Sequence, residues 1–208
     1  MKLLIAIPCM DFMHVEFVKS ITGLVEELKD KNIPYEIVFQ SGTLVYVARD
    51  KLASRAIQCD YTDVLWLDSD MVFQPNILED LMFSEKDFVS GIYQTRRKPH
   101  SATVFRQIKP EVIPYDKYPA DTFEIKACGF GCVYMKPWIL AKVMEEYGTC
   151  FTPLKEYGED ITFCLRVDEL GIKMYAEPFV RLGHIGHIVV DETDHEFWKQ
   201  TISNYPFP

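Results

Sequence analysis

The chain has 208 residues, 48% of them hydrophobic and 25% charged, which is the composition of an ordinary globular domain large enough to bury a core. Its 22 Lys and Arg against 31 Asp and Glu residues give a net charge of −9. This balance argues against non-specific binding to nucleic acid or to an anionic membrane face. No segment reaches the roughly eighteen apolar residues of a membrane span, so we expect no transmembrane segment.

The N-terminus and the cysteines indicate a cytoplasmic protein. The first apolar run, Leu3 to Ile7, stops at Pro8 without the small-residue cleavage site of a signal peptide. The 6 cysteines are scattered and include no CxxC pair, and Cys128 and Cys132 lack a second Cys or His pair at zinc spacing. We therefore interpret them as reduced, mostly buried thiols.

Strand-like runs alternate with helical periodicity in the first half of the chain. Short apolar runs that predict strands cover residues 3–7, 35–39, 64–67 and 88–93. Apolar residues at helical spacing lie between them, over residues 17–28, 45–57 and 75–82. This β-α-β-α-β-α-β alternation predicts a parallel sheet with right-handed crossovers.

The second half of the chain is less regular. Residues 95–118 are rich in Lys, Arg and Pro and predict a loop with short strands. The other expected elements are strands at 123–127 and 131–135, helices at 137–147 and 159–170, and final strands at 174–176 and 180–189. Because no repeat or linker divides the chain, we predict one α/β domain over residues 1–190, with a mainly parallel central sheet flanked by helices. A C-terminal tail, residues 191–208, is expected to pack on it.

The third predicted strand ends directly in Asp68-Ser69-Asp70. Open α/β sheets bind ligands outside the carboxyl ends of their strands. Two carboxylates there suit a hard divalent cation, which in turn can hold a diphosphate. The alternative interpretation is a turn in which Asp70 or a later residue caps the next helix.

Two further motifs contain glycine. Gly129-Phe130-Gly131 precedes a predicted strand, where glycines either let a ligand approach the backbone or mark a bulge or tight turn. Gly158-Glu159-Asp160 opens a predicted helix. Acidic residues in the first turn of a helix are favoured by its dipole, and an acid placed over a pocket can also act as a general base towards a hydroxyl.

A late histidine motif and a basic cluster complete the candidate residues. In Gly183-His184-Ile185-Gly186-His187, a histidine is either a hydrogen-bonded core residue or a further ligand in an oxygen-rich manganese site. The cluster at residues 96–100 contains Arg96, Arg97 and Lys98 and is either a solvated loop or a clamp for phosphates. Arg49 adds a cation inside the second predicted helix.

Taken in order, these motifs resemble the family 2 glycosyltransferases of the GT-A fold, particularly the compact bacterial and phage-type members. The resemblance extends to about residue 190 and rests on residues 47–50, 65–70, 90–93 with 96–99, 129–132, 158–160 with 163, and 183–186. It implies a single Rossmann-like GT-A domain. It also implies an enzyme that transfers a hexosyl or N-acetylhexosaminyl group from a nucleotide sugar, a UDP-sugar by default, to an acceptor hydroxyl by a single inverting displacement.

The resemblance assigns roles to the candidate residues. Asp68 and Asp70 would hold Mn²⁺ or Mg²⁺ against the donor diphosphate, and His184 would approach the metal, with His187 as the open alternative. Asp160 would be the base for the acceptor hydroxyl, with Glu159 in support. The donor would be bound by Pro8, Asp11, Arg49, Asp68, Ser69, Asp70, Arg97, Gly129 and Gly131. The resemblance leaves open whether the basic loop at residues 96–100 closes over the donor or the acceptor.

The chain departs from the family pattern at several points; for example, Lys136 stands where an arginine is frequent. Gln40-Ser41 stands where many relatives have an acid that reads uracil, and Arg49-Asp50 stands where many have Arg-Asn. The acceptor is open: a glycan, a lipid-linked sugar, a protein or another hydroxyl. Two other functions remain as alternatives, a nucleotidyltransferase acting on a sugar phosphate and a non-catalytic module that binds nucleotide sugars. The first usually has a glycine-rich basic loop after its first strand, and Pro8-Cys9-Met10-Asp11-Phe12 is neither.

Overall fold

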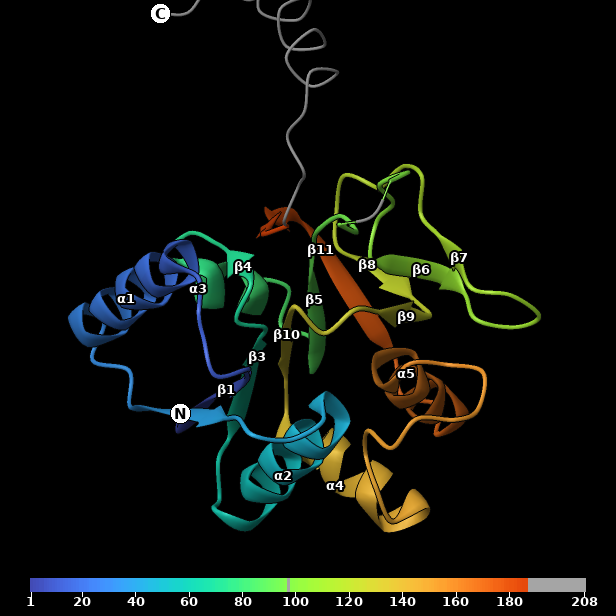
Figure 1. Ribbon diagram of the computed structural model, residues 1–208, viewed down its shortest axis with the longest axis horizontal. Coiled ribbons are helices and arrows are strands. Elements are labelled where there is room, and N and C mark those ends of the chain that lie inside the picture. The colour runs from blue at the N-terminus through green and yellow to red at the C-terminus, as the bar shows by residue number, and fades with distance from the viewer. Residues whose placement is uncertain (97, 187–208) are drawn as a thin grey trace, which may run out of the picture.

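The first half of the chain forms the predicted alternation of strands and helices (Figure 1). The computed structural model describes residues 1–96 and 98–186. In chain order the elements of this half are β1 (Leu3–Pro8), α1 (Val15–Asp30), β2 (Tyr35–Gln40), α2 (Val45–Gln58), β3 (Asp63–Leu67), β4 (Met71–Val72), α3 (Ile77–Met82) and β5 (Phe88–Ile92). The helices form where predicted because their apolar residues recur on one face, as Phe17, Leu24 and Leu28 do in α1.

The second half contains shorter strands and two helices. Its elements are β6 (Val104–Gln107), β7 (Ile113–Pro114), β8 (Phe123–Ile125), β9 (Ala127–Cys128), β10 (Cys132–Met135), α4 (Pro137–Tyr147), α5 (Glu159–Glu169), β11 (Met174–Arg181) and β12 (Gly183–His184). Pro137 occupies the first position of α4, where a missing N–H costs nothing. Gly171 follows α5 with φ of +71°, the left-handed conformation that ends many helices.

One strand replaces two predicted ones. The sequence predicts separate strands at 174–176 and from Val180 onwards, whereas β11 runs without a break from Met174 to Arg181. The register of β11 against β5 shifts between Ala176 and Arg181, and Pro178 lies inside the shifted segment. A bulge tolerates proline within a strand, which explains why the apolar pattern is interrupted there.

The central sheet has the strand order β2-β1-β3-β10-β5-β11-β8. β1 pairs in parallel with β2 and β3, as predicted. The predicted parallel sheet is then interrupted, because β10 lies between β3 and β5 and is antiparallel to both. All residues of β10 are buried. β11 is parallel to β5, and β8 is antiparallel to β11 at the edge. The sheet is mainly parallel in the sense that β2, β1, β3, β5 and β11 run in one direction, and only β10 and β8 run in the other.

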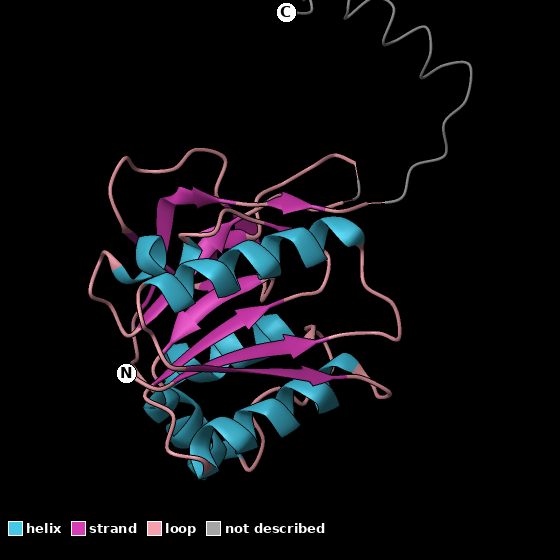
Figure 2. Cartoon of the chain, turned by 90° about the vertical axis from the view of Figure 1, so that its left-hand side faces the viewer, coloured by secondary structure: helices cyan, strands magenta, loops and turns pink. Residues whose placement is uncertain are grey.

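Helices cover both faces of the sheet (Figure 2). α1 and α3 pack on the face that carries Leu3 and Ile5, whereas α2, α4 and α5 pack on the face that carries Leu4 and Trp66. Because successive residues of a strand point to opposite faces, covering both faces requires a continuous apolar run. This is why β1 and β3 contain such runs. Because the helices cover the faces of the sheet, the carboxyl ends of these strands remain accessible.

Two small sheets lie outside the central one. β12 pairs antiparallel with β4, with His184 opposite Met71, and β6 pairs with β7 and β9. The predicted tail at residues 191–208 and the end of the last predicted strand, 187–189, lie outside the described residues. Within the described ranges, no helix combines the length and the apolar character that a membrane crossing requires.

Candidate functional site

Asp68-Ser69-Asp70 and the glycine pair meet at the carboxyl edge of β3. Because β10 runs antiparallel to β3, the residues that precede β10 stand beside those that follow β3, with Cys132 opposite Leu67. The backbone N–H of Asp68 donates to the Gly131 carbonyl at 3.1 Å. The strand that interrupts the parallel order therefore brings together two motifs that are far apart in the sequence.

Arg49 of α2 is the buried cation of this edge, with its side chain 3% exposed. Its Nη2 donates to both carboxylate oxygens of Asp68, at 3.0 and 3.2 Å, and its Nη1 donates to the Phe130 carbonyl at 3.4 Å. Its Nε lies 3.7 Å from Glu159 Oε1 and has no hydrogen-bond partner among the described residues. Arg49 therefore links the carboxylate motif, the glycine motif and the start of α5.

Asp70 contacts two groups from other segments. Its Oδ2 lies 2.9 Å from Arg96 Nη1 and 3.6 Å from His184 Nε2. His184 Nδ1 lies 2.9 Å from the Gln94 carbonyl, and a carbonyl only accepts, so Nδ1 carries a proton and Nε2 faces Asp70. The backbone N–H of Ile185 donates to the Asp70 carbonyl at 2.9 Å. The pairing of β4 with β12 thus delivers His184 to Asp70.

The helix-cap interpretation of this motif is wrong. β4 follows Asp70, and the next helix, α3, begins at Ile77. The residue at its N-cap position, Asn76, makes no capping hydrogen bond with its side chain. The carboxylates of Asp68 and Asp70 instead interact with Arg49 and Arg96.

Burial and neighbouring charge perturb the acidic groups in opposite directions. Burial raises the pKa of Asp68 to about 6, because Arg49 offsets it only in part while Asp70 adds negative charge. Burial and then the charge of Glu159 raise the pKa of Asp160. Burial alone would also raise the pKa of Asp70, but contact with His184 and the charge of Arg96 lower it. Asp70 is therefore the firmly ionised member of the motif.

His184 responds to the same pair of charges. Burial lowers the pKa of His184, but its contact with Asp70 and its hydrogen bond to the Gln94 carbonyl outweigh burial, so the pKa of His184 is raised. The ring also meets the Tyr93 ring edge-on, with centroids 5.1 Å apart. Packing and charge together fix the imidazole beside Asp70.

Two pockets lie on either side of Asp70. The first has a volume of about 410 Å³. Its lining consists of Pro8, Cys9, Met10, Thr43, Leu44, Val45, Ala48, Arg49, Asp68, Ser69, Asp70 and Glu159. The second, of about 450 Å³, is lined by Tyr93, Thr95, Arg96, Lys98, Pro99, Thr103, Phe105, Gly129, Asp160, Ile161 and His184. Because Arg96 and His184 of the second pocket contact Asp70 of the first, the two pockets meet at Asp70.

Glu159 and Asp160 open α5 and face different neighbours. Asp160 Oδ1 accepts the backbone N–H of Ile161 at 2.7 Å, so this carboxylate stabilises the start of its own helix, as the capping interpretation expects. The same side chain lines the second pocket, whereas Glu159 lines the first and faces Arg49. Asp160 therefore stabilises the start of α5 and lines a pocket at the same time.

The glycine pair makes room for Tyr93, a residue that the sequence analysis did not single out. A Cβ at Gly129 would lie 2.3 Å from the Tyr93 hydroxyl, and one at Gly131 would lie 2.7 Å from Tyr93 Cζ. The Gly131 N–H donates to that hydroxyl at 3.0 Å. Close packing inside the protein explains the glycines, although Gly129 also lines the second pocket. The signal available in the sequence was an aromatic residue at the end of the strand predicted over residues 88–93.

The remaining predicted residues fall into three groups. Pro8 and Ser69 line the first pocket. Asp11 is exposed and lies outside the lining of both pockets. Arg97 and His187 lie outside the described residues. Arg96, which entered the sequence analysis only as one member of a basic cluster, is the described arginine of that cluster that contacts the acidic motif.

Asp50, one of the departures from the family pattern, faces away from the first pocket. Its carboxylate accepts hydrogen bonds from the backbone N–H groups of Cys150 and Phe151, both at 2.8 Å, and from the Thr149 hydroxyl at 2.6 Å. Phe151 in turn stacks on Phe163 of α5, with ring centroids 4.6 Å apart. Asp50 therefore holds the segment between α4 and α5 in place.

The charges of the site fit a divalent cation, although the ligand set is not fully arranged for one. No group of three or more His, Cys, Asp or Glu side chains within residues 1–96 and 98–186 is placed to hold a metal ion. Four carboxylates, those of Asp68, Asp70, Glu159 and Asp160, nevertheless lie near the guanidinium groups of Arg49 and Arg96. Carboxylate oxygens with an imidazole suit manganese.

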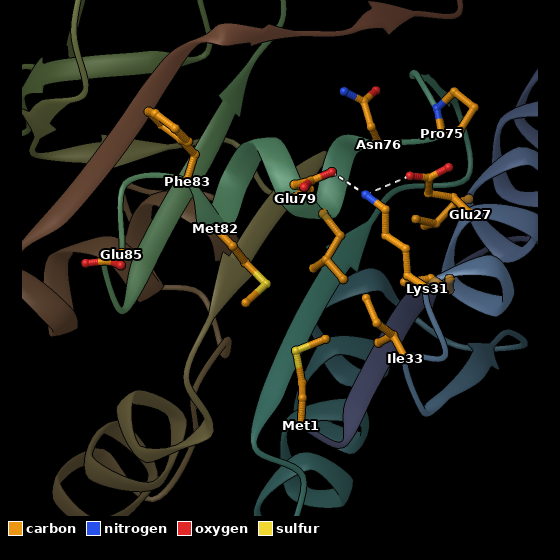
Figure 3. Close-up of a pocket in the computed structure, with 13 residues that line it drawn as sticks. Met1, Glu27, Lys31, Ile33, Pro75, Asn76, Glu79, Met82, Phe83 and Glu85 are labelled. Carbon is orange, nitrogen blue, oxygen red and sulfur yellow. Dashed lines mark hydrogen bonds and ion pairs between the residues drawn. The ribbon is translucent and has the colours of Figure 1, made fainter.

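A larger pocket, of about 570 Å³, lies elsewhere, between α1 and α3 (Figure 3). Its floor is apolar and includes Leu24, Leu28 and Leu78. Figure 3 shows Lys31 at its rim, paired with Glu27 and Glu79. Its lining includes none of the candidate site residues.

Comparison with known proteins gives structural neighbours but no sequence family. No protein-family model and no curated protein matches the chain. The crystal structure of A197 from STIV matches with a TM-score of 0.55 and 21% sequence identity, over 92% of this chain and 97% of that chain.

Two glycosyltransferase structures match as well. The crystal structure of GalNAc-T7 with UDP, GalNAc and Mn²⁺ has a TM-score of 0.59 and 11% identity, over 90% of this chain but only 44% of that chain. The catalytic domain of Drosophila β1,4-galactosyltransferase 7 in complex with xylobiose has a TM-score of 0.54 and 12% identity, over 95% of this chain and 79% of that chain. At these identities the likeness shows the fold. The chain has a GT-A-like α/β fold, which confirms the predicted fold class.

Proposed function

We propose that the chain is a metal-dependent inverting glycosyltransferase that moves a sugar from a nucleotide-diphosphate donor to an acceptor hydroxyl. One observation carries this proposal: on a GT-A-like fold, Asp70 and Asp160 line two pockets that meet at the carboxyl edge of the sheet. The first pocket is proposed for the donor and the second for the transferred sugar and the acceptor. The order of the sequence motifs supports family 2 among these enzymes.

The first pocket suits a nucleoside diphosphate. Its lining combines apolar and small polar residues from the ends of β1 and the start of α2, among them Pro8 and Leu44, with the charged group of Arg49, Asp68 and Asp70. A nucleoside would lie on the former and the diphosphate would face the latter. UDP remains the default donor nucleotide, and Mn²⁺ or Mg²⁺ the default metal. The presence of UDP, GalNAc and Mn²⁺ in the GalNAc-T7 structure supports these choices and a hexosyl or N-acetylhexosaminyl donor.

Asp70 and His184 are the residues of this chain best placed to hold the metal. A bound divalent cation would neutralise the charge that develops on the departing diphosphate. Asp70 brings an ionised oxygen and His184 an imidazole nitrogen that faces that same oxygen at 3.6 Å. Asp68 is held by Arg49, so its proposed role is to orient that arginine and to add negative charge beside the metal.

Asp160 is the proposed general base. It lines the second pocket together with Arg96 and His184. Burial and the charge of Glu159 raise the pKa of Asp160, and a carboxylate with a raised pKa is a stronger base towards a hydroxyl. Attack from the Asp160 side on a sugar whose diphosphate leaves towards Asp70 is an in-line displacement, and a single displacement inverts the anomeric centre.

The proposal also includes the bounds of the domain, the acceptor and the location of the protein. In this proposal the transferase domain has the bounds predicted from the sequence, residues 1–190. The acceptor is a hydroxyl of a glycan, a lipid-linked sugar, a protein or another molecule. A cytoplasmic, reducing location is supported by the free state of the cysteines Cys9, Cys59, Cys128, Cys132, Cys150 and Cys164.

Calorimetric titration with UDP in the presence of Mn²⁺ tests the donor site. We expect Asp70→Ala to weaken UDP binding by at least about 100-fold, which corresponds to about 2.7 kcal/mol. The matched control is Asp116→Ala, which removes an exposed carboxylate outside both pockets and should leave the affinity unchanged. Equal affinity of the Asp70→Ala and control variants would refute the assignment of the donor diphosphate to Asp70.

A further inference from the structure

Arg96 contacts the same carboxylate oxygen that the proposed metal needs. Its Nη1 lies 2.9 Å from Asp70 Oδ2, the oxygen that also faces His184 Nε2 at 3.6 Å. The Arg96 side chain is 51% exposed and that of Asp70 is 21% exposed. An ion pair this open to water is weak, because solvent screens its charges. The Arg96–Asp70 pair is therefore easily broken.

We infer that Arg96 takes the place of the divalent cation at Asp70. Its guanidinium must move away from the Asp70 carboxylate before a metal ion can bind there. The inference rests on the proposed function, because it concerns the metal of the same donor site. A metal bound to a carboxylate oxygen lies about 2.0–2.2 Å from it, inside the distance at which the guanidinium of Arg96 now lies. The guanidinium and a metal ion on the same oxygen would repel each other, so Arg96 weakens metal binding for as long as it stays on Asp70.

The segment that carries Arg96 allows the side chain to move without unfolding its surroundings. Gln94 pairs with Ala102 as an antiparallel bridge, and the Thr95 N–H donates to the Ser101 carbonyl at 2.8 Å. These contacts fix the base of the loop. The stem of Arg96 lies over Gly186, where an added Cβ would be 3.6 Å from Arg96 Cγ. Rotation of the exposed side chain about this stem is therefore sufficient to release Asp70.

Once released from Asp70, the Arg96 guanidinium can bind a phosphate of the donor. Its side chain lines the second pocket together with Lys98, at the boundary where a diphosphate held in the first pocket would leave the sugar. The planar guanidinium binds carboxylate and phosphate oxygens with the same fork geometry. Arg96 therefore exchanges the Asp70 carboxylate for a phosphate when the metal and the donor bind together.

This exchange predicts effects of opposite sign on two ligands. Without nucleotide, Arg96 competes with the metal for Asp70. Arg96→Gln should therefore bind Mn²⁺ about five- to tenfold more tightly than the wild type, because the variant has neither the ion pair that must be broken nor the repulsion between the two cations. With saturating Mn²⁺, Arg96 assists the diphosphate, so the same variant should bind UDP about tenfold more weakly. Arg96→Lys keeps the charge and should lie close to the wild type in the first measurement.

Titration of Mn²⁺ followed by electron paramagnetic resonance gives the first affinity directly, with no substrate and no turnover. Arg106→Gln is the matched control, because Arg106 is an exposed arginine of β6 outside both pockets. Circular dichroism checks that each variant is folded. Tighter Mn²⁺ binding by Arg96→Gln alone, with weaker UDP binding, supports the inference. Mn²⁺ affinity equal to or below that of the wild type overturns it, as does the absence of Mn²⁺ binding in every variant.

The result can be separated from the outcome for the proposed function. If Arg96→Gln binds Mn²⁺ more tightly but no nucleotide sugar is turned over, the exchange at Asp70 stands and the transferase assignment fails. If a nucleotide sugar is turned over and Mn²⁺ affinity is insensitive to Arg96, the transferase assignment stands and the exchange fails.

Discussion

The charge of Asp68 makes the free energy of unfolding depend on pH in a direction opposite to that of an ordinary paired carboxylate. Folding raises the pKa of Asp68 from 3.8 to about 6, chiefly through burial. A group whose pKa is raised by folding contributes stability that is fully present below its unfolded pKa and is lost as the pH rises through its folded pKa. The protonated Asp68 therefore favours the fold, and its ionisation near neutral pH opposes it.

The size of this effect follows from the shift. At about 1.4 kcal/mol for each pKa unit, a shift of about two units is worth about 3 kcal/mol in total. About 2 kcal/mol of this total falls between pH 4.5 and pH 8, because the unfolded group begins to ionise below that range. Asp68→Asn removes the titrating group and keeps an oxygen that accepts from Arg49. The difference in unfolding free energy between wild type and variant should therefore fall by about 2 kcal/mol across this range.

Urea denaturation at a series of pH values, with a chelator present, measures this difference. Each pair of curves gives the unfolding free energy of wild type and Asp68→Asn at one pH. Addition of Mn²⁺ at neutral pH should then stabilise the wild type, since a bound cation offsets the excess negative charge around Asp68. A difference that stays constant with pH would show that burial does not perturb the ionisation of Asp68.

Three further predictions concern the base, the glycine pair and the segment before α5. Asp160→Asn should retain UDP binding in Mn²⁺ and reduce transfer by about 10²- to 10⁴-fold; normal turnover in a product assay would remove Asp160 as the base. Gly131→Ala should lower the unfolding free energy by about 1–3 kcal/mol, because its Cβ would lie 2.7 Å from the buried Tyr93 ring. Gly186→Ala, whose nearest neighbour is at 3.6 Å, should be nearly neutral in the same denaturation experiment. Asp50→Ala should destabilise the fold by about 2–4 kcal/mol in urea, since it strands the N–H groups of two residues; a loss below about 0.5 kcal/mol would contradict this.

Local elements could be predicted from the sequence because local spacing determines them. The apolar stripe of α1 and the continuous apolar runs of β1 and β3 are visible without any neighbour. The position of β10 was not predictable in this way. Its run of four residues reads as a strand, but its place between β3 and β5 depends on contacts between distant parts of the chain, which periodicity does not encode.

The same limit applies to the site. Asp68 and Asp70 follow a buried strand, so their place at the sheet edge could be predicted. The partners of these carboxylates depend on how a helix, a loop and a small sheet are placed around that edge. Arg49 pairs with Asp68, whereas Arg96 and His184 contact Asp70. The sequence showed which charged residues were available, whereas tertiary structure decides which of them pair.

The products formed from nucleotide sugars distinguish a glycosyltransferase from the alternative functions. A panel of nucleotide sugars is incubated with the protein and Mn²⁺, and the phosphorus-containing products are identified by ³¹P nuclear magnetic resonance. We expect at least one donor to release a nucleoside diphosphate, UDP in the default case, in a reaction that Asp70→Ala abolishes. Release of pyrophosphate, which a nucleotidyltransferase produces, would contradict it, and so would a panel in which no donor is cleaved.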